Sequence, residues 1–219
     1  MSSKKHEQVN EFFDGYSEKW DSLYGKERKK DPLSKFADEV LRAVIKRRLS
    51  TTLGFTKSEK IKTILDAGCG SGQYVVEFAK QGKLVTGLDF AESMLKIAKK
   101  SIKDENLPGV DFLQADFVEH DFSKKYDAVC AMGFFDYIEN PAPVLKKMVS
   151  ISNHEVYASF PKAKGILALQ RRVRYKLRSC PLWLYSEKRL LAILKQSGAS
   201  GKYELVDLGR DWIVRIKVS

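Results

Sequence analysis

The stretch from Lys62 to Tyr74 constrains the fold more than any other part of the chain. Its apolar run ends at Asp66, and glycines follow at every second position: Gly68, Gly70 and Gly72. The run is typical of a buried parallel strand, and the glycines allow a sharp turn that a ligand can approach closely. The helix that follows directs its free N–H groups back toward the turn. Strand, turn and helix together predict a site for a nucleoside-carrying ligand with a negative group.

Two later strands also end in a carboxylate. The stretch Lys83–Phe90 contains Asp89 near its end, and Val110–Phe117 contains Asp116. In a doubly wound sheet, the carboxyl ends of such strands meet at one crevice. An aspartate at the second strand is an acceptor suited to two ribose hydroxyls, and Asp116 could accept a hydrogen bond from an adenine amino group.

The spacing of the glycines separates two classes of cofactor. The dinucleotide fingerprint G-x-G-x-x-G would need a glycine where the chain has Gln73. The pattern Asp-x-Gly-x-Gly-x-Gly instead resembles the first motif of class I S-adenosylmethionine methyltransferases, and this resemblance extends from about Lys62 to the C-terminus. It implies S-adenosylmethionine as the cofactor and an α/β fold with a doubly wound seven-stranded sheet, order 3-2-1-4-5-7-6.

The resemblance also implies which residues hold the cofactor. Asp66 would order the loop or meet the ammonium group through water, and Phe90 would lie against the adenine, with Phe117 on its other side. The backbone at Met132 would face the exit of the methyl group. The complete expected set is Asp66, Gly68, Gly70, Gly72, Asp89, Phe90, Asp116, Phe117, Met132 and Tyr16.

The segment before the first strand is expected to be helical. Tyr16, Trp20 and Tyr24 lie four apart, so they share one helical face. This segment resembles the N-terminal cover helix of small-molecule methyltransferases, although the same stripe could simply pack on the core. A second helix is expected over Ser34–Ser50, with Gly54 as its stop.

We therefore expect one domain, with a helical cover over 1–54 and a Rossmann-like core over 60–219. After the first strand, the alternating pattern is typical of an α/β chain, and it ends in an antiparallel pair. The expected helices lie near 71–80, 91–101, 141–150, 164–178 and after 186, and the expected strands near 83–90, 110–117, 126–132, 155–160, 203–208 and 212–218.

The formal net charge is +11, and much of the excess is local. No Asp or Glu occurs between Val156 and Ser186, whereas seven cations do: Lys162, Lys164, Arg171, Arg172, Arg174, Lys176 and Arg178. Such a patch indicates an anionic substrate, a membrane surface or nucleic acid, or else a solvated helix face. The helical spacing predicts an inward apolar face. The segment follows the fifth strand, where the methyltransferase family commonly inserts elements that shape the substrate pocket, so the resemblance implies arginines near the mouth of that pocket. The inward residues would be Ile166, Leu169, Val173 and Leu177, and the arginines Arg171, Arg174 or Arg178.

Composition excludes several other classes. Three scattered cysteines and three histidines give neither a disulfide framework nor a metal-ligand cluster, and they suit a reducing cytoplasm. The first residues lack the apolar region of a signal peptide, and no run of about eighteen apolar residues is present.

A narrower resemblance concerns the acceptor. The stretches Phe12–Asp14, Leu23–Gly25 and Asp66–Gly70, with Ser159–Phe160 before the basic segment, resemble the magnesium-protoporphyrin O-methyltransferases, which esterify a carboxylate. Their N-terminal tyrosine, thought to act in catalysis, falls on Tyr24. Their histidine after the fourth strand falls on Glu139, which is a departure, so the resemblance is taken only as a hint of substrate charge.

These features predict a methyltransferase that acts on a small, anionic molecule at oxygen, with Tyr24 and Glu139 as the candidate catalytic residues. Two alternatives stay open. One is an RNA methyltransferase that uses the basic segment 162–178, and the other is a cofactor-binding partner protein without catalysis. The acceptor molecule and the oligomeric state do not follow from the sequence.

Overall fold

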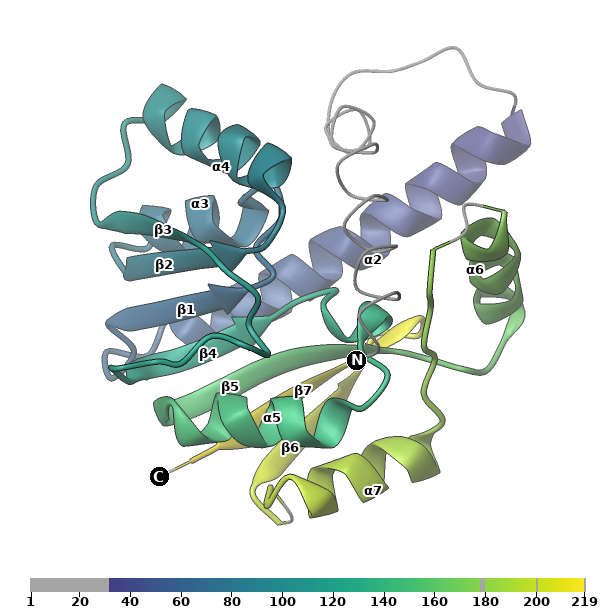
Figure 1. The fold of residues 1–219 in the computed structure, drawn as a ribbon. Coiled ribbons are helices and arrows are strands. Elements are labelled where there is room, and N and C mark those ends of the chain that lie inside the picture. The colour runs from purple at the N-terminus through teal and green to yellow at the C-terminus, as the bar shows by residue number, and fades with distance from the viewer. Residues whose placement is uncertain (1–31, 178–179, 200, 219) are drawn as a thin grey trace.

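A seven-stranded sheet forms the centre of the computed structural model, which describes residues 32–177, 180–199 and 201–218, without the side chains of 32–41, 166, 167 and 174 (Figure 1). The strand order is β3-β2-β1-β4-β5-β7-β6, so the predicted fold class is confirmed. The strands are β1 (Thr63–Ala67), β2 (Leu84–Asp89), β3 (Val110–Gln114), β4 (Tyr126–Ala131), β5 (Ser152–Pro161), β6 (Tyr203–Asp207) and β7 (Asp211–Lys217).

The register of the strands brings the ends of β1, β2 and β4 together. β1 lies between β2 and β4 and is parallel to both, with Asp66 opposite Gly87 on one side and Cys130 on the other. β7 is antiparallel to β5 and β6, as the terminal pair of predicted strands requires. The carboxyl ends of the parallel strands therefore form one edge, where a ligand is expected in a doubly wound sheet.

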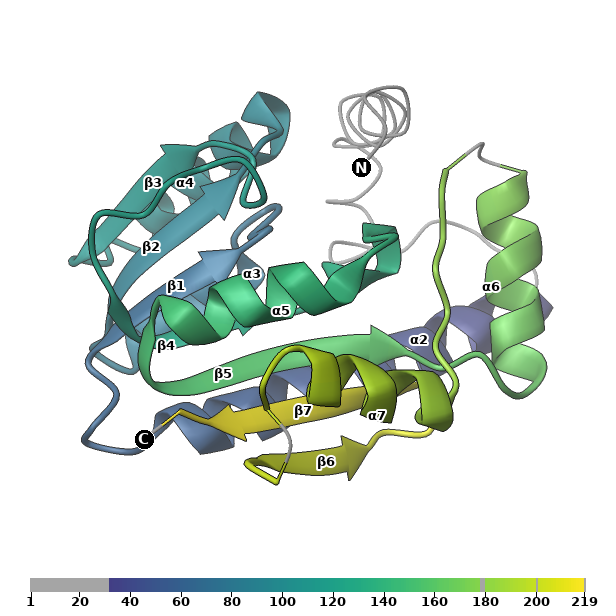
Figure 2. The same ribbon diagram turned by 60° about the horizontal axis from the view of Figure 1, so that its bottom comes forward.

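Helices cover both faces of the sheet, and Figure 2 shows α5 and α7 on the near face and α2 on the far face. One apolar cluster joins α5 and α7 to the sheet through residues such as Leu145 and Leu190. A second joins α2, α3 and α4 to the other face through Leu53, Phe78 and Leu95. The helices are α2 (Pro32–Thr56), α3 (Gln73–Lys80), α4 (Glu92–Asp104), α5 (Pro141–Ser150), α6 (Ile166–Lys176) and α7 (Glu187–Gln196), with a 3-10 turn η1 (Phe135–Tyr137).

Most expected bounds agree with the structure to within a few residues, and two local predictions are confirmed in detail. α5 spans Pro141–Ser150 as predicted. The Ser186 hydroxyl caps α7 by accepting a hydrogen bond from the Arg189 N–H at 3.2 Å. None of the described helices combines the length and the apolar character that a membrane span requires.

The end of α2 differs from the prediction. The helix continues through Gly54 to Thr56, so the expected stop at Gly54 is wrong. Lys46, Arg47 and Arg48 therefore lie within the helix and not in its last turn. Thr52 and Thr56 are fully buried, and the Thr56 hydroxyl donates to the Gln81 side chain at 2.8 Å. Tertiary packing of the last turns outweighs the weak helix propensity of one glycine.

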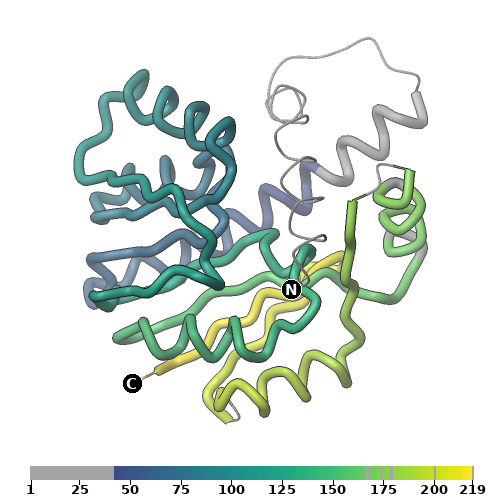
Figure 3. Tube along the Cα trace, in the orientation of Figure 1, coloured from purple at the N-terminus to yellow at the C-terminus, as the bar shows by residue number. Residues whose placement is uncertain are grey.

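α6 also differs, because its apolar row faces away from the protein. Leu169, Val173 and Leu177 are 60%, 53% and 82% exposed, whereas Ala168 and Arg171 are buried. The prediction that these three apolar residues face inward is therefore wrong. In the Cα trace, α6 (green) stands beyond the end of β5, at the margin of the layered body (Figure 3).

Candidate active site

The glycine turn after β1 is tied to the neighbouring strand. The N–H groups of Gly68 and Cys69 both donate to the Leu88 carbonyl, at 2.8 and 3.0 Å. Gly72 precedes α3 with φ +82°, and no side chain caps the first turn of that helix. The first N–H groups of α3 therefore point toward the crevice without a side-chain acceptor, as the sequence predicts for an anion site.

The three glycines of the turn serve different purposes. All have positive φ, which L side chains rarely adopt. A Cβ at Gly68 would lie 2.6 Å from the Phe134 ring, and a Cβ at Gly72 would lie 2.7 Å from the Ala98 Cβ. A Cβ at Gly70 would meet nothing within 4 Å. Gly68 and Gly72 thus permit close packing, whereas Gly70 borders open space that a ligand can enter.

Asp89, at the end of β2, holds the same turn from the other side. Its two carboxylate oxygens accept from the Gly70 N–H at 2.8 Å and from the Ala91 N–H at 2.9 Å. The side chain is 7% exposed, and burial raises its pKa, while the backbone donors oppose that rise. A third backbone hydrogen bond to Asp89 comes from Phe90, and because a carboxylate has about four acceptor positions, capacity remains for a ribose hydroxyl.

Asp66, at the end of β1, is the least satisfied polar group of the crevice. It is 2% exposed, and among the described residues its Oδ2 has no hydrogen-bond partner. Burial and, secondarily, the Asp89 carboxylate raise the pKa of Asp66 to about 7, while Arg48 opposes this rise. A buried acceptor without a donor fits a positively charged or hydrogen-bonding ligand group.

The residues expected around an adenine surround the next strand end. Asp116 lies two residues beyond β3, which ends at Gln114, and its Oδ1 accepts from the Val118 N–H at 2.7 Å. Phe117 is 1% exposed, and its ring contacts those of Phe122 and Phe134 at centroid distances of 5.4 and 5.9 Å. Phe90 is half-buried directly after Asp89. Their roles toward adenine stay predictions.

The remaining predicted residues fall in separate places. Met132 is buried at the end of β4, where its sulfur accepts from the Thr52 hydroxyl at 3.8 Å. Glu139 is exposed in the loop between η1 and α5. Tyr16 and Tyr24 lie outside the described residues. The structure thus brings Asp66, Gly70 and Asp89 into direct proximity and does not place Glu139 among them.

A chain of buried charges leads from this crevice to α6. Arg48 of α2 donates to the Tyr74 hydroxyl at 3.2 Å, and its guanidinium lies 3.8 Å from the Asp211 carboxylate. Asp211 also accepts from Arg171 at 2.9 Å, and Arg171 forms a further ion pair with Asp136. Burial alone would lower the pKa of Arg171, but its two carboxylate partners raise it, so the guanidinium stays charged.

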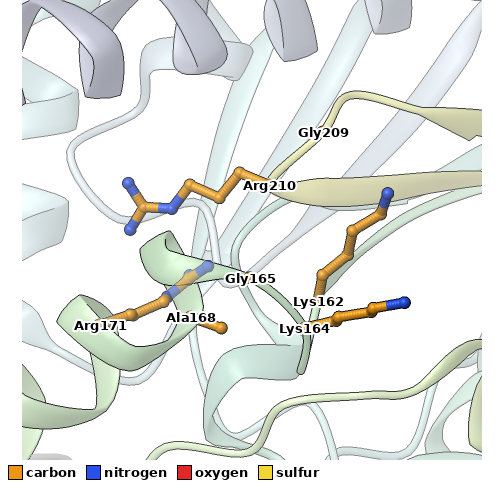
Figure 4. Close-up of a pocket in the computed structure, with 7 residues that line it drawn as sticks. All are labelled: Lys162, Lys164, Gly165, Ala168, Arg171, Gly209 and Arg210. Atoms are coloured by element: carbon orange, nitrogen blue, oxygen red, sulfur yellow. The ribbon is translucent and has the colours of Figure 1, made fainter.

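Next to this chain of charges lies a cationic pocket of about 300 Å³. It lies between the end of β5, the start of α6 and the turn before β7. Figure 4 shows Arg210 extending over α6 toward Arg171, while Lys162 and Lys164 extend to the other side. Its lining residues include no acid: Lys162, Lys164, Gly165, Ala168, Arg171, Gly209 and Arg210.

The sequence and the fold of this chain were each compared with those of known proteins. Residues 64–154 match the family model described as "Methyltransferase domain". The fold superposes on magnesium protoporphyrin IX methyltransferase from Synechocystis PCC 6803 with bound SAH, with a TM-score of 0.78 over 96% of this chain and 98% of that one, at 18% identity. Residues 64–154 thus match a methyltransferase domain, and the chain as a whole has the seven-stranded fold of the class I methyltransferases.

Curated relatives match parts of this chain. A ubiquinone biosynthesis O-methyltransferase from Hydrogenovibrio crunogenus is 35% identical over 85 residues, which cover 38% of this chain and 35% of that protein. Another from Acinetobacter baumannii is 27% identical over 126 residues, which cover 55% of this chain and 53% of that protein. The chain thus spans about half or less of the length of these relatives.

Sequence reasoning missed three residues of the site region. Arg48 lies within the helix expected over Ser34–Ser50, and it turns inward toward Tyr74 and Asp211. Arg210 and Asp211 fall between the expected strands at 203–208 and 212–218, where no local pattern marks them as part of a site. The absence of acids over 156–186 was the available signal, because buried cations there need carboxylates supplied from elsewhere in the chain.

Proposed function

We propose that this chain transfers the methyl group of S-adenosylmethionine to an oxygen atom of a small molecule that carries an anionic group. The observation that carries this proposal is that a crevice and a cationic pocket lie at the same edge of the sheet. The crevice of Asp66, Gly70 and Asp89 fits the cofactor, and the cationic pocket fits the acid of the acceptor. The buried pairs Arg48–Asp211 and Arg171–Asp211 connect the two.

The crevice supports the cofactor assignment through its own unsatisfied groups. Among the described residues the Asp66 Oδ2 has no donor, Gly70 borders open space, and no side chain caps the first turn of α3. In this assignment Asp89 accepts from the ribose, and Asp116 with Phe90 and Phe117 borders the adenine. When bound, the cofactor supplies a methyl group on positively charged sulfur, which is already a good leaving group.

The chain's own contribution is then to hold the acceptor oxygen in line with that methyl group. Such positioning can supply roughly 7–11 kcal/mol of the barrier reduction. The O–C bond forms as the S–C bond breaks, and the sulfur becomes neutral. A carboxylate acceptor needs no base at neutral pH, whereas a phenol of pKa near 10 must lose its proton. Tyr24 and the exposed Glu139 are our candidates for that second case.

Cofactor choice tests the crevice directly. By calorimetry, S-adenosylmethionine or its demethylated product should bind and NAD should not. Asp89→Ala should weaken that binding about tenfold or more, because hydrogen bonds to a charged group are worth roughly 1.5–3 kcal/mol. Asp104→Ala, an exposed carboxylate on α4, is the matched control. Binding of NAD alone, or unchanged affinity in Asp89→Ala, would contradict the assignment.

Acceptor choice tests the cationic pocket. The pure protein is incubated with S-adenosylmethionine and candidate metabolites, and products that gain one CH₂ unit in mass are identified. We expect acidic metabolites among them, and the double variant Lys164→Gln/Arg210→Gln should raise KM for the acceptor about tenfold or more. The matched control, Lys188→Gln/Lys202→Gln, removes the same charge from exposed positions elsewhere. Equal KM values in the two double variants would place acceptor recognition outside this pocket.

A further inference from the structure

α6 presents a row of apolar side chains to solvent. Leu169, Val173 and Leu177 lie four residues apart, so they form one ridge along the helix. All three are more than half exposed. The other large apolar side chains exposed in the described part of the chain lie singly on separate elements: Leu84, Val118 and Leu191. Single exposed apolar residues are normal, whereas a contiguous row marks an interaction surface.

The opposite face of α6 fixes this orientation. Ala168, Arg171 and Tyr175 are buried against the body of the protein. Arg171 is ion-paired with Asp136 and Asp211, and the Tyr175 hydroxyl lies 3.1 Å from the Tyr137 hydroxyl. Rotation of the helix to bury its apolar row would expose or break these pairs. The outward position of the row is therefore a stable property of the fold.

Cations lie beside the apolar row. Arg172 and Lys176 are exposed and follow Leu169 and Val173 by three residues, so they form the adjacent ridge. Lys164 is exposed just before the helix. The sequence carries no Asp or Glu from 157 to 185, so α6 and the segments next to it in the chain supply no carboxylate to this surface.

We infer that this outer face of α6, formed by Leu169, Val173, Leu177, Arg172 and Lys176, docks on a membrane surface that contains anionic lipids. An apolar ridge flanked by cations is the composition of a helix that lies in a lipid interface. The apolar side chains enter the boundary of the acyl chains, and the cations meet the lipid phosphates. An RNA backbone would satisfy the cations but would leave the apolar ridge in water. The inference does not depend on the proposed methyl transfer.

The position of α6 permits this contact. In both ribbon views α6 stands at the margin of the molecule, beyond the end of β5 (Figures 1 and 2). Figure 1 shows the first turns of α2 beside one end of α6, whereas α3, α4, α5 and α7 lie away from it. A planar surface can therefore approach the outer face without displacing the core elements.

Flotation with lipid vesicles tests the inference. The full chain is mixed with vesicles of phosphatidylcholine alone, or of equal parts phosphatidylcholine and phosphatidylglycerol, and is centrifuged through a density gradient. We expect it to float with the mixed vesicles and to remain at the bottom with phosphatidylcholine alone. High salt should reduce the floating fraction, because it screens the charges of lipid and protein.

Two variants separate the apolar and the charged contributions. Leu169→Gln/Val173→Gln/Leu177→Gln should lower the partition onto mixed vesicles by about tenfold or more. Arg172→Gln/Lys176→Gln should lower it and remove most of its salt dependence. The matched controls, Leu84→Gln/Leu191→Gln and Lys188→Gln/Lys195→Gln, should float as the parent does. Because all these side chains are exposed, thermal unfolding should be nearly unchanged in each variant.

Three outcomes would overturn the inference. The first is a parent protein that fails to float with the mixed vesicles. The second is a dimer in sedimentation that the apolar triple variant converts to a monomer, which would assign the face to a second copy. The third is flotation unchanged by the triple variant, together with salt-sensitive binding of an RNA oligonucleotide that only the cation variant abolishes.

Discussion

Replacing Arg171 with glutamine is expected to lower the free energy of unfolding by about 3–5 kcal/mol. The guanidinium is 7% exposed and pairs with two carboxylates, Asp136 and Asp211, that are themselves buried. Glutamine removes the positive charge and leaves both carboxylates in a poorly solvated environment. Asp211 would keep its ion pair with Arg48, whereas Asp136 would have to take up a proton or draw in water, and both processes cost free energy. Denaturant unfolding followed by circular dichroism measures the difference.

The neighbouring residue provides the control for this experiment. Arg172 is exposed on the same helix, so Arg172→Gln removes the same charge from the same segment. Its effect should stay within about 0.5 kcal/mol. A double variant, Arg171→Met/Asp136→Asn, should recover part of the loss, because it removes the Asp136 charge together with that of Arg171, while Asp211 keeps its ion pair with Arg48. Equal effects of Arg171→Gln and Arg172→Gln would show that the buried pairs contribute little.

The arrangement of the sheet could be predicted because its signals are local. The apolar run before Asp66, the glycines after it and the repeated strand ends at Asp89 and near Asp116 each occupy a short stretch of sequence. Helix starts were also accessible, since Ser186 and Pro141 act within one turn. Local rules of capping and periodicity suffice for such features.

The orientation of α6 could not be predicted by the same rules. Periodicity assigns the apolar row to the core, on the assumption that arginine belongs outside. Here Arg171 is the buried residue, because Asp136 and Asp211 pair with it from positions 35 and 40 residues away in the chain. The inward turn of Arg48 toward Tyr74 and Asp211 is likewise set by distant partners. Ion pairs between residues so far apart in the sequence leave no pattern in a short stretch of it.

The two parts of the site therefore differ in how far sequence reasoning reached. Asp66, Gly70 and Asp89 lie close together as the motif spacing predicted, and their contacts with one another follow from strand register. The cationic pocket joins residues after β5 to the turn before β7, and only the tertiary fold brings these together. Arg171 lines that pocket, and its guanidinium forms ion pairs with two buried acids, Asp136 and Asp211.

The pH dependence of folding should report the state of Asp66. Its pKa in the folded protein is about 7, compared with an ordinary value of 3.8. Because the folded state binds this proton more tightly than the unfolded state, the stability contributed at low pH is lost as the pH rises from about 4 to about 7. The loss amounts to about 4 kcal/mol, since one pKa unit corresponds to about 1.4 kcal/mol. Above about pH 7 both states are ionised, and this contribution stays constant.

Asp66→Asn removes that titration, so the free energy of unfolding of the variant, relative to the parent, should rise between pH 5 and pH 8. Asp104→Asn, at an exposed carboxylate, should leave the pH profile unchanged. Curves that run parallel for the parent and Asp66→Asn would show that Asp66 is ionised throughout this range.

Protonation of Asp66 should also affect binding of the proposed cofactor. A positively charged group beside Asp66 favours the carboxylate over the acid, so binding should release a proton below about pH 7. The affinity for S-adenosylmethionine should therefore increase as the pH rises from about 5 to about 7 and then level off. Calorimetry in two buffers with different heats of ionisation counts the released proton directly. In Asp66→Asn the release and the rise in affinity should both disappear. Proton release that persists in this variant would assign the titrating group elsewhere and would remove Asp66 from the ammonium side of the site.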